Sequence, residues 1–396
     1  MENFVYPEML KVTKYETYGT LPDLFQFDDG TRVTCPAEWE ARRAEIYKQA
    51  VELQYGTQPP APEVFEYETL YVGGKGGMNT YRITAGTKEK QVTFIAKLFL
   101  PGWGVPTPTP LPPVIVDGDL AFKYAFDKEF MNTALDKGIA WMLFDRTELA
   151  NDMQFKGRGN GPLHKVYPEY TFGALGAWAW GYSRCVDLLE KLELTNPDMI
   201  AFTGHSRGGK TAALAGVLDT RAAIVNPNDT CAGACSCYRL YVEGEYMGNN
   251  DPNRGIQFKK SEMLSDLWRN FDFWMGPELG QYADHPEDLP FDAHSLKAMV
   301  APRILFVSEA AGDLWANPIG SWQTTMAASE VFKYLGVPEN LYWYFRPGVH
   351  FHQPLDVAML VNIILQRTIG APADEKFFHV GFQKPELLFD WRAPEN

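Results

Sequence analysis

Cysteine is scarce in this chain, and the spacing of the cysteines argues against a structural zinc site. The 396 residues contain five cysteines, an odd number. Three of them lie close together with no second cluster, which is unlike the paired spacing of a structural zinc site. We therefore expect reduced thiols, although one disulfide is compatible with the spacing, and no bound metal. The cysteines are Cys35, Cys185, Cys231, Cys235 and Cys237.

Positive charge and long apolar runs are also in short supply. There are 36 lysines and arginines against 50 aspartates and glutamates, which gives a net charge of −14 and a pI near 5.0. A nucleic-acid partner or an anionic membrane surface would require clustered basic residues, so we expect neither. No run reaches the roughly 18 apolar residues of a membrane span, and the opening residues 1–5 do not begin a signal peptide. The chain as written predicts no export signal, and its compartment stays open.

What remains is a composition suited to one large core. Hydrophobic residues make up 45% of the chain and charged residues 22%. We expect a single domain over residues 1–396. Residues 1–62 are rich in proline, tyrosine and charge without a clear period, and are predicted to wrap over that domain. Residues 238–291 interrupt the later rhythm of elements and are predicted to form an insertion over the functional site.

One short motif carries chemistry. Gly204, Ser206 and Gly208 form a Gly-x-Ser-x-Gly sequence between a strand-like run at 199–202 and a helix-like run at 211–218. This is the context of a nucleophile elbow, in which glycines permit a sharp turn and the serine projects from it. The residue after the serine then offers its backbone N–H to an oxyanion. The motif predicts a serine hydrolase.

The hydrophobic periodicity supports the same fold class. Strands and helices alternate after about residue 114, which predicts a mostly parallel sheet covered by helices on both faces. We expect an α/β-hydrolase three-layer sandwich, with active groups at the carboxyl ends of its strands. Strands are expected at 70–72, 81–84, 92–100, 114–116, 140–144, 199–202, 222–225, 304–307 and 341–345, and helices at 174–192, 211–218, 322–335 and 355–365.

The histidine of such an enzyme follows the nucleophile late in the chain. His350 and His352 come after the strand expected at 341–345 and an Arg-Pro-Gly turn. His350 has the Gly-x-His spacing and is the preferred general base, with His352 as the fallback.

Two aspartates can serve as the acid. Asp229 follows the strand expected at 222–225, and Asp313 follows the strand expected at 304–307. Either carboxylate could hold the histidine in the tautomer that accepts the serine proton. The spacing does not choose between them.

Two cations flank the nucleophile. Lys210 lies one helical turn beyond Ser206, and its side chain leans back toward the serine because helical side chains point toward the N-terminus. A cation in a first helical turn opposes the helix dipole, which indicates a function such as binding ligand oxygens. Arg207 can add its guanidinium beside the oxyanion as well as its backbone N–H.

Together these residues resemble those of the glucuronoyl esterases, carbohydrate esterase family 15. The resemblance extends from about Val114 to Asp356 and rests on six ordered motifs. They are residues 173–184 (GALGAWAWGYSR), 204–210 (GHSRGGK), 289–294 (LPFDAH), 301–303 (APR), 313–318 (DLWANP) and 346–350 (RPGVH).

The resemblance implies an α/β-hydrolase that cleaves the ester between 4-O-methyl-glucuronic acid on xylan and an alcohol of lignin, without metal or cofactor. It places the family's serine, arginine, lysine and histidine on Ser206, Arg207, Lys210 and His350. Members commonly carry the acid as glutamate at the position of Asp229, and others use the position of Asp313. The resemblance therefore favours Asp229 narrowly, with Asp313 as its substitute or helper.

It further implies substrate contacts from Glu245 and Trp315. A carboxylate can accept hydrogen bonds from sugar hydroxyls, and an indole can stack on the ligand or donate to it. The expected partner is glucuronoxylan or a lignin–carbohydrate ester, and a monomer is expected.

Two other functions fit the same residues. One is an acetyl or feruloyl polysaccharide esterase on the same fold. The other is a carbohydrate-binding protein with a weakened triad, which the intact serine, arginine, lysine and histidine disfavour.

Overall fold

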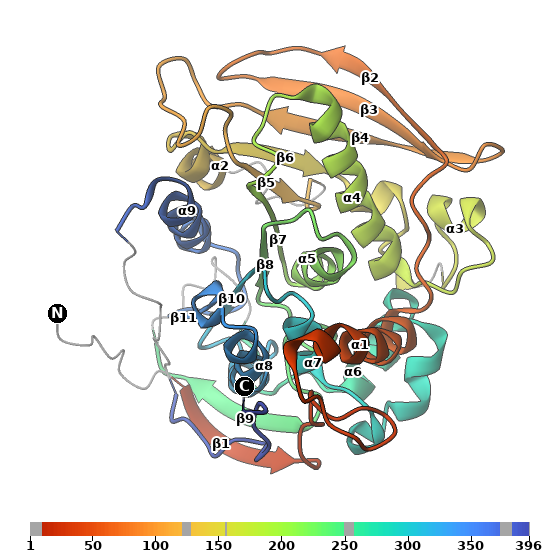
Figure 1. Cartoon of the computed structure of the whole chain (residues 1–396), viewed down its shortest axis with the longest axis vertical. Coiled ribbons are helices and arrows are strands. Elements are labelled where there is room, and N and C mark those ends of the chain that lie inside the picture. The colour runs from red at the N-terminus through yellow and green to blue at the C-terminus, as the bar shows by residue number, and fades with distance from the viewer. Residues whose placement is uncertain (1–9, 121–127, 155–156, 249–256, 373–381, 396) are drawn as a thin grey trace.

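The computed structural model describes residues 10–120, 128–154, 157–248, 257–372 and 382–395. Within them, a nine-stranded sheet in the order β11-β10-β8-β7-β5-β6-β4-β3-β2 crosses the molecule (Figure 1). The six strands from β11 to β6 are parallel, and β4, β3 and β2 continue antiparallel. The predicted mostly parallel α/β sheet is confirmed. Its strands are β2 (Val64–Tyr71), β3 (Met78–Gly86), β4 (Gln91–Phe99), β5 (Val114–Asp117), β6 (Ala140–Phe144), β7 (Ile200–His205), β8 (Ile224–Asn228), β10 (Ile304–Ala310) and β11 (Leu341–Arg346).

Burial explains why these segments form strands. Every residue of β5, β6, β8 and β10 is buried, because helices cover both faces of the parallel part of the sheet. In β4 buried and more exposed residues alternate, and β2 at the edge is largely exposed. Continuous apolar runs therefore identify the centre of the sheet, and alternation identifies its antiparallel extension.

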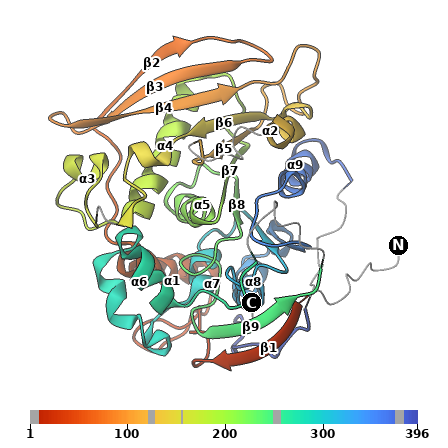
Figure 2. The same ribbon diagram turned by 180° about the vertical axis from the view of Figure 1, so that it is seen from behind.

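Helices form a layer on each face of the sheet (Figures 1 and 2). On one face α2 and α9 pack through residues such as Phe130 and Leu360. On the other face α4, α5 and α8 pack through Trp178, Leu214 and Val331. The helices are α1 (Pro36–Tyr47), α2 (Lys128–Leu135), α3 (Pro162–Val166), α4 (Ala174–Leu192), α5 (Arg207–Leu218), α6 (Leu264–Phe271), α7 (Ala293–Ala298), α8 (Pro318–Tyr334) and α9 (Pro354–Ile369).

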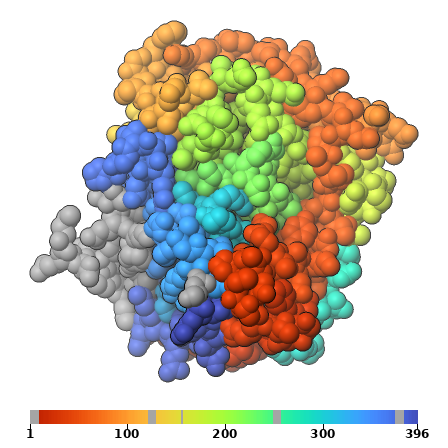
Figure 3. All heavy atoms as spheres, viewed as in Figure 1, coloured from red at the N-terminus to blue at the C-terminus, as the bar shows by residue number. Residues whose placement is uncertain are grey.

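A separate two-stranded sheet lies beside this sandwich. β1 (Leu10–Thr17) pairs antiparallel with β9 (Leu240–Tyr246), so the start of the described chain contacts the segment predicted as an insertion. α1 packs into the larger core through Trp39 and Ile46, and Figure 3 shows this N-terminal segment, in red, on the outside of the molecule. The division into a wrap at 1–62 and an insertion at 238–291 stays a prediction.

Two features of the sequence can be checked on these residues. All five cysteines are free thiols, with Cys35 exposed and the others buried. Among the described helices, none has the length and apolar character that a bilayer crossing requires.

Candidate active site

The sharp turn at Ser206 joins β7 to α5. Ser206 has φ 56° and ψ −116°, a conformation that non-glycine residues seldom adopt. The turn is so tight that a Cβ on Gly204 would lie 2.5 Å from the carbonyl carbon of Gly208, and a Cβ on Gly208 would lie 2.4 Å from a carboxylate oxygen of Asp119. Gly204 is therefore required by the close approach of backbone, and Gly208 by the close approach of the Asp119 carboxylate. The turn has the geometry of a nucleophile elbow.

His350 lies in the loop after β11 and contacts the serine. Its Nε2 is 3.0 Å from Ser206 Oγ, and its Nδ1 is 2.5 Å from Asp313 Oδ2. Asp313 follows β10 and is fully buried. Burial lowers the pKa of His350, but the charge of Asp313 and its hydrogen bond raise it by more, so this pKa lies above its ordinary value. A hydrogen-bonded chain thus runs from the hydroxyl through the imidazole to the carboxylate of Asp313.

Asp229, the acid favoured by resemblance, has other partners. Its Oδ2 accepts a hydrogen bond from Arg346 at 3.0 Å, and its Oδ1 accepts one from the backbone N–H of Ala310 at 2.5 Å. Arg346 also contacts Asp356 at 2.8 Å, so it bridges two carboxylates in the buried interior. The structure therefore gives the hydrogen bond to His350 to Asp313. Asp229 also lies nearby, with a carboxylate oxygen within 4.8 Å of a His350 ring nitrogen, but its hydrogen bonds go to Arg346 and Ala310.

The fallback histidine lies behind the site. His352 is buried, and its ring stacks on that of His205 with centres 5.4 Å apart. The ring of His205 also lies 4.7 Å from that of His350, so the three histidines form a ring cluster. Burial lowers the pKa of His352 to about 4. His350, and not His352, is hydrogen-bonded to Ser206. His352 instead packs against His205, which in turn packs against His350.

Arg207 is the first residue of α5, so its backbone N–H has no partner inside the helix. Its guanidinium donates to Asp152 Oδ2 at 2.9 Å and lies 4.9 Å from the centre of the Trp274 ring. The side chain of Arg207 is 34% exposed. The helix N-terminus and the guanidinium can both stabilise negative charge beside the serine.

Lys210 is almost fully buried and faces an acid that sequence reasoning missed. Its Nζ lies 3.7 Å from Glu262 Oε2, and Glu262 also accepts a hydrogen bond from the backbone N–H of Ala232 at 3.1 Å. Burial raises the pKa of the Glu262 carboxyl to about 7, although the charge of Lys210 opposes the rise. Glu262 had no local signal because it sits in an irregular, charged stretch 52 residues beyond its partner.

The two predicted substrate contacts have different surroundings. Trp315 lies near the site, because its ring stacks on Phe258 at 5.0 Å and Phe258 in turn lies 6.1 Å from the His350 ring. Glu245 is exposed on β9, opposite Lys11 of β1. The structure therefore separates Trp315 from His350 by one ring, that of Phe258, whereas Glu245 is exposed on β9.

Among the residues that the structure describes, two groups of potential metal ligands overlap at this site. They are His205 with Asp229 and His350, and Cys231 with Asp313 and His350, the ligand atoms of each group lying within 4.8 Å of one another. Both groups include His350, whose two nitrogens already contact the serine and Asp313.

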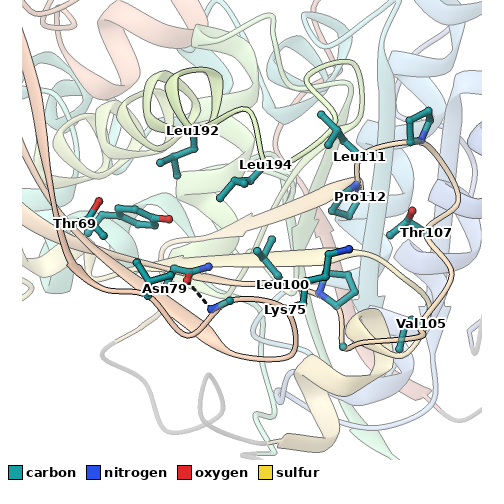
Figure 4. Close-up of a pocket in the computed structure, with 16 residues that line it drawn as sticks. Thr69, Lys75, Asn79, Leu100, Val105, Thr107, Leu111, Pro112, Leu192 and Leu194 are labelled. Carbon is teal, nitrogen blue, oxygen red and sulfur yellow. Dashed lines mark hydrogen bonds between the residues drawn. The ribbon is translucent and has the colours of Figure 1, made fainter.

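A pocket lies at the end of the sheet opposite Ser206. Its volume is about 490 Å³, and it is enclosed by the β2–β3 turn, the loop after β4 and the end of α4 (Figure 4). Leu100, Leu111, Leu192 and Leu194 make it largely apolar, with Lys75 and Asn79 among its few polar residues. The parallel strands begin at this end of the sheet, whereas Ser206 directly follows the last residue of β7. The pocket is therefore separate from Ser206.

Known proteins resemble this chain over most of its length. The family model described as "Glucuronyl esterase, fungi" matches residues 83–336. The 4-O-methyl-glucuronoyl methylesterase of Schizophyllum commune is 30% identical over 84% of this chain and 78% of its own length.

Solved structures agree with the sequence matches. A carbohydrate esterase family 15 glucuronoyl esterase from Caldicellulosiruptor kristjansonii superposes with a TM-score of 0.76 at 28% identity, covering 93% of this chain and 95% of that one. The glucuronoyl esterase catalytic domain of Hypocrea jecorina also gives 0.76, at 25% identity, with 96% and 98% covered. With a nucleophile elbow in the matched region, the chain belongs to the glucuronoyl esterases of carbohydrate esterase family 15, which are carboxylic ester hydrolases.

Proposed function

We propose that this chain hydrolyses esters of 4-O-methyl-glucuronic acid, and that its substrate in plant material is the ester joining glucuronoxylan to a lignin alcohol. The observation that carries the proposal is the hydrogen-bonded chain of Ser206, His350 and Asp313. The choice of 4-O-methyl-glucuronic acid as the acid part of the substrate rests on the named activity of the relatives. Three groups in hydrogen-bond contact provide nucleophile, base and orienting acid.

The reaction follows from this geometry. Ser206 Oγ attacks the ester carbonyl while His350 Nε2 takes its proton, and Asp313 stabilises the imidazolium that forms. The oxyanion receives the backbone N–H and the guanidinium of Arg207. His350 then protonates the departing alcohol, which leaves an ester between Ser206 and the uronic acid. Water, deprotonated by His350, attacks this acyl-enzyme and releases the uronic acid.

Charge in the site fits a uronate ester. The substrate ester is neutral and the released acid is an anion, so nearby cations favour the transition state and tolerate the product. Arg207 and Lys210 supply two cations, and Glu262 can accept hydrogen bonds from sugar hydroxyls beside Lys210. Trp315 offers an indole that stacks on Phe258, the ring beside His350.

Hydrolysis rates test the proposal. Wild type and Ser206→Ala are compared on methyl and benzyl glucuronate, with 4-nitrophenyl acetate as the control ester. We expect the glucuronate esters to be preferred and all turnover to be lost in Ser206→Ala. Cleavage of the acetate alone would favour the acetyl or feruloyl esterase. Binding of glucuronoxylan without turnover of any ester would favour the carbohydrate-binding protein.

A further inference from the structure

Asp152 links two parts of the active site that lie far apart in the sequence. It follows η3 (Arg146–Glu148), and its side chain is 10% exposed. One carboxylate oxygen accepts from Arg207 Nη1 at 2.9 Å, and the other accepts from Trp274 Nε1 at 3.0 Å. Each oxygen therefore holds one donor, and neither donor belongs to Asp152's own loop.

Trp274 forms a platform beneath both cations of the site. Its ring centre lies 4.9 Å from the guanidinium of Arg207 and 5.7 Å from the ammonium of Lys210. Phe271 stacks on the Trp274 ring, with ring centres 3.9 Å apart and planes 6° from parallel. The hydrogen bond from the Trp274 indole N–H to Asp152 fixes the orientation of this ring within its own plane.

We propose that Asp152 is a positioning residue for the guanidinium of Arg207, which it orients together with the indole of Trp274 toward the oxyanion. The inference rests on the proposed function and extends it by one residue. An arginine side chain carries about 2 kcal/mol of rotamer entropy, and that of Arg207 is 34% exposed. A carboxylate at its edge and an indole on its face restrict the guanidinium to one plane before substrate arrives. Donors arranged in advance need no reorganisation when the oxyanion forms.

A purely structural role is already provided by neighbouring contacts. Gln154 donates to the carbonyl of Arg269 at 3.0 Å, and Arg158 donates to the carbonyl of Asp272 at 2.8 Å. These bonds join the same two segments as Asp152 does, without contacting Arg207. Gln154→Ala is consequently a matched control for loss of one tie between the segments.

The test is a double-mutant cycle between Asp152 and Arg207. Asp152→Asn keeps the size of the side chain, but its amide offers one acceptor where two donors meet. We expect kcat for methyl glucuronate to fall about 10- to 100-fold, because a misplaced catalytic group costs up to about that factor. KM should change less than about 3-fold, because the oxyanion exists only beyond the ground state.

The background of Arg207→Ala separates positioning from structure. There, Asp152→Asn should lower kcat less than about 2-fold further, since Asp152 acts through Arg207. Gln154→Ala should leave kcat unchanged in both backgrounds. Equal effects of Asp152→Asn with and without Arg207, or a normal kcat in Asp152→Asn, would overturn the proposal. If Asp152→Asn cannot be purified folded, the same cycle is run with Asp152→Ser.

The cycle also has a readout that does not depend on the sugar. A fluorophosphonate modifies Ser206 by forming an O–P bond and expelling fluoride, while His350 takes the serine proton. Its rate uses the same oxyanion site. If the wild type fails on glucuronate esters but reacts with this probe, the proposed substrate is wrong and the cycle of modification rates still decides the role of Asp152.

Discussion

The identity of the catalytic acid can be tested by replacing each aspartate with asparagine. In Asp313→Asn the amide oxygen is expected to keep the contact now made by Oδ1, which accepts from the N–H of Ala316 at 3.3 Å. The amide NH₂ then faces His350 Nδ1, 2.5 Å from the replaced oxygen. His350 must accept that hydrogen bond and carry its own proton on Nε2. This tautomer cannot take a proton from Ser206.

The size of the effect follows from this loss of tautomer. In a serine protease with the same three groups, the equivalent substitution lowers kcat about 10⁴-fold. We expect a fall of about 10²- to 10⁴-fold for Asp313→Asn, which corresponds to about 3–5 kcal/mol of activation free energy.

Asp229→Asn should act on stability instead. Both oxygens of Asp229 accept hydrogen bonds, one from Arg346 and one from the N–H of Ala310, so an amide must turn its NH₂ toward a donor. A buried hydrogen bond lost in this way costs about 1–3 kcal/mol. Arg346 retains Asp356, so its charge stays paired. We expect kcat to fall less than about 10-fold, because the tautomer of His350 is preserved.

The assay is initial-rate hydrolysis of methyl glucuronate by the wild type and both variants, with urea unfolding of each protein. The expected result is a large loss of kcat with near-normal stability in Asp313→Asn, and the reverse in Asp229→Asn. A folded Asp229→Asn that is more damaged in kcat than Asp313→Asn would refute the assignment of Asp313.

Three further outcomes are expected. The rate constant kcat/KM should rise with pH and reach half of its maximum above pH 6.5, because the base must be neutral and Asp313 raises the pKa of His350 against the effect of burial; a midpoint below 6 would contradict this in a pH–rate profile. Gly208→Ala should lower both the thermal unfolding temperature and turnover, since its Cβ would lie 2.4 Å from a buried carboxylate oxygen; unchanged melting would show that the turn can relax. Glu262→Gln should raise KM for glucuronate esters about 10-fold by weakening a charge-assisted hydrogen bond beside Lys210, with 4-nitrophenyl acetate unaffected as the control; equal losses on both esters would mean that Glu262 does not contact the sugar.

Local sequence was sufficient for the elements whose signals are local. The expected strand at 140–144 is β6 and the expected helix at 174–192 is α4, with the same bounds, because a buried apolar run and a helical period depend only on neighbouring residues. The Gly-x-Ser-x-Gly motif likewise placed Ser206 between a strand and a helix. By contrast, β1 and β9 were missed, since their pairing joins segments more than 200 residues apart.

The sequence also predicted the order of nucleophile, acid and histidine, but it did not choose between the two acids. Asp229 and Asp313 both follow strands of one sheet, and the strands β8 and β10 are neighbours. Only the folded structure shows which carboxylate hydrogen-bonds to His350. Arg346, the last residue of β11, donates to Asp229, and His350 is bonded to Asp313. The partners of the two cations, Asp152 and Glu262, were likewise decided by tertiary structure. A charged residue in a loop belongs to no periodic pattern, so its partner can be identified only after folding brings the two side chains together.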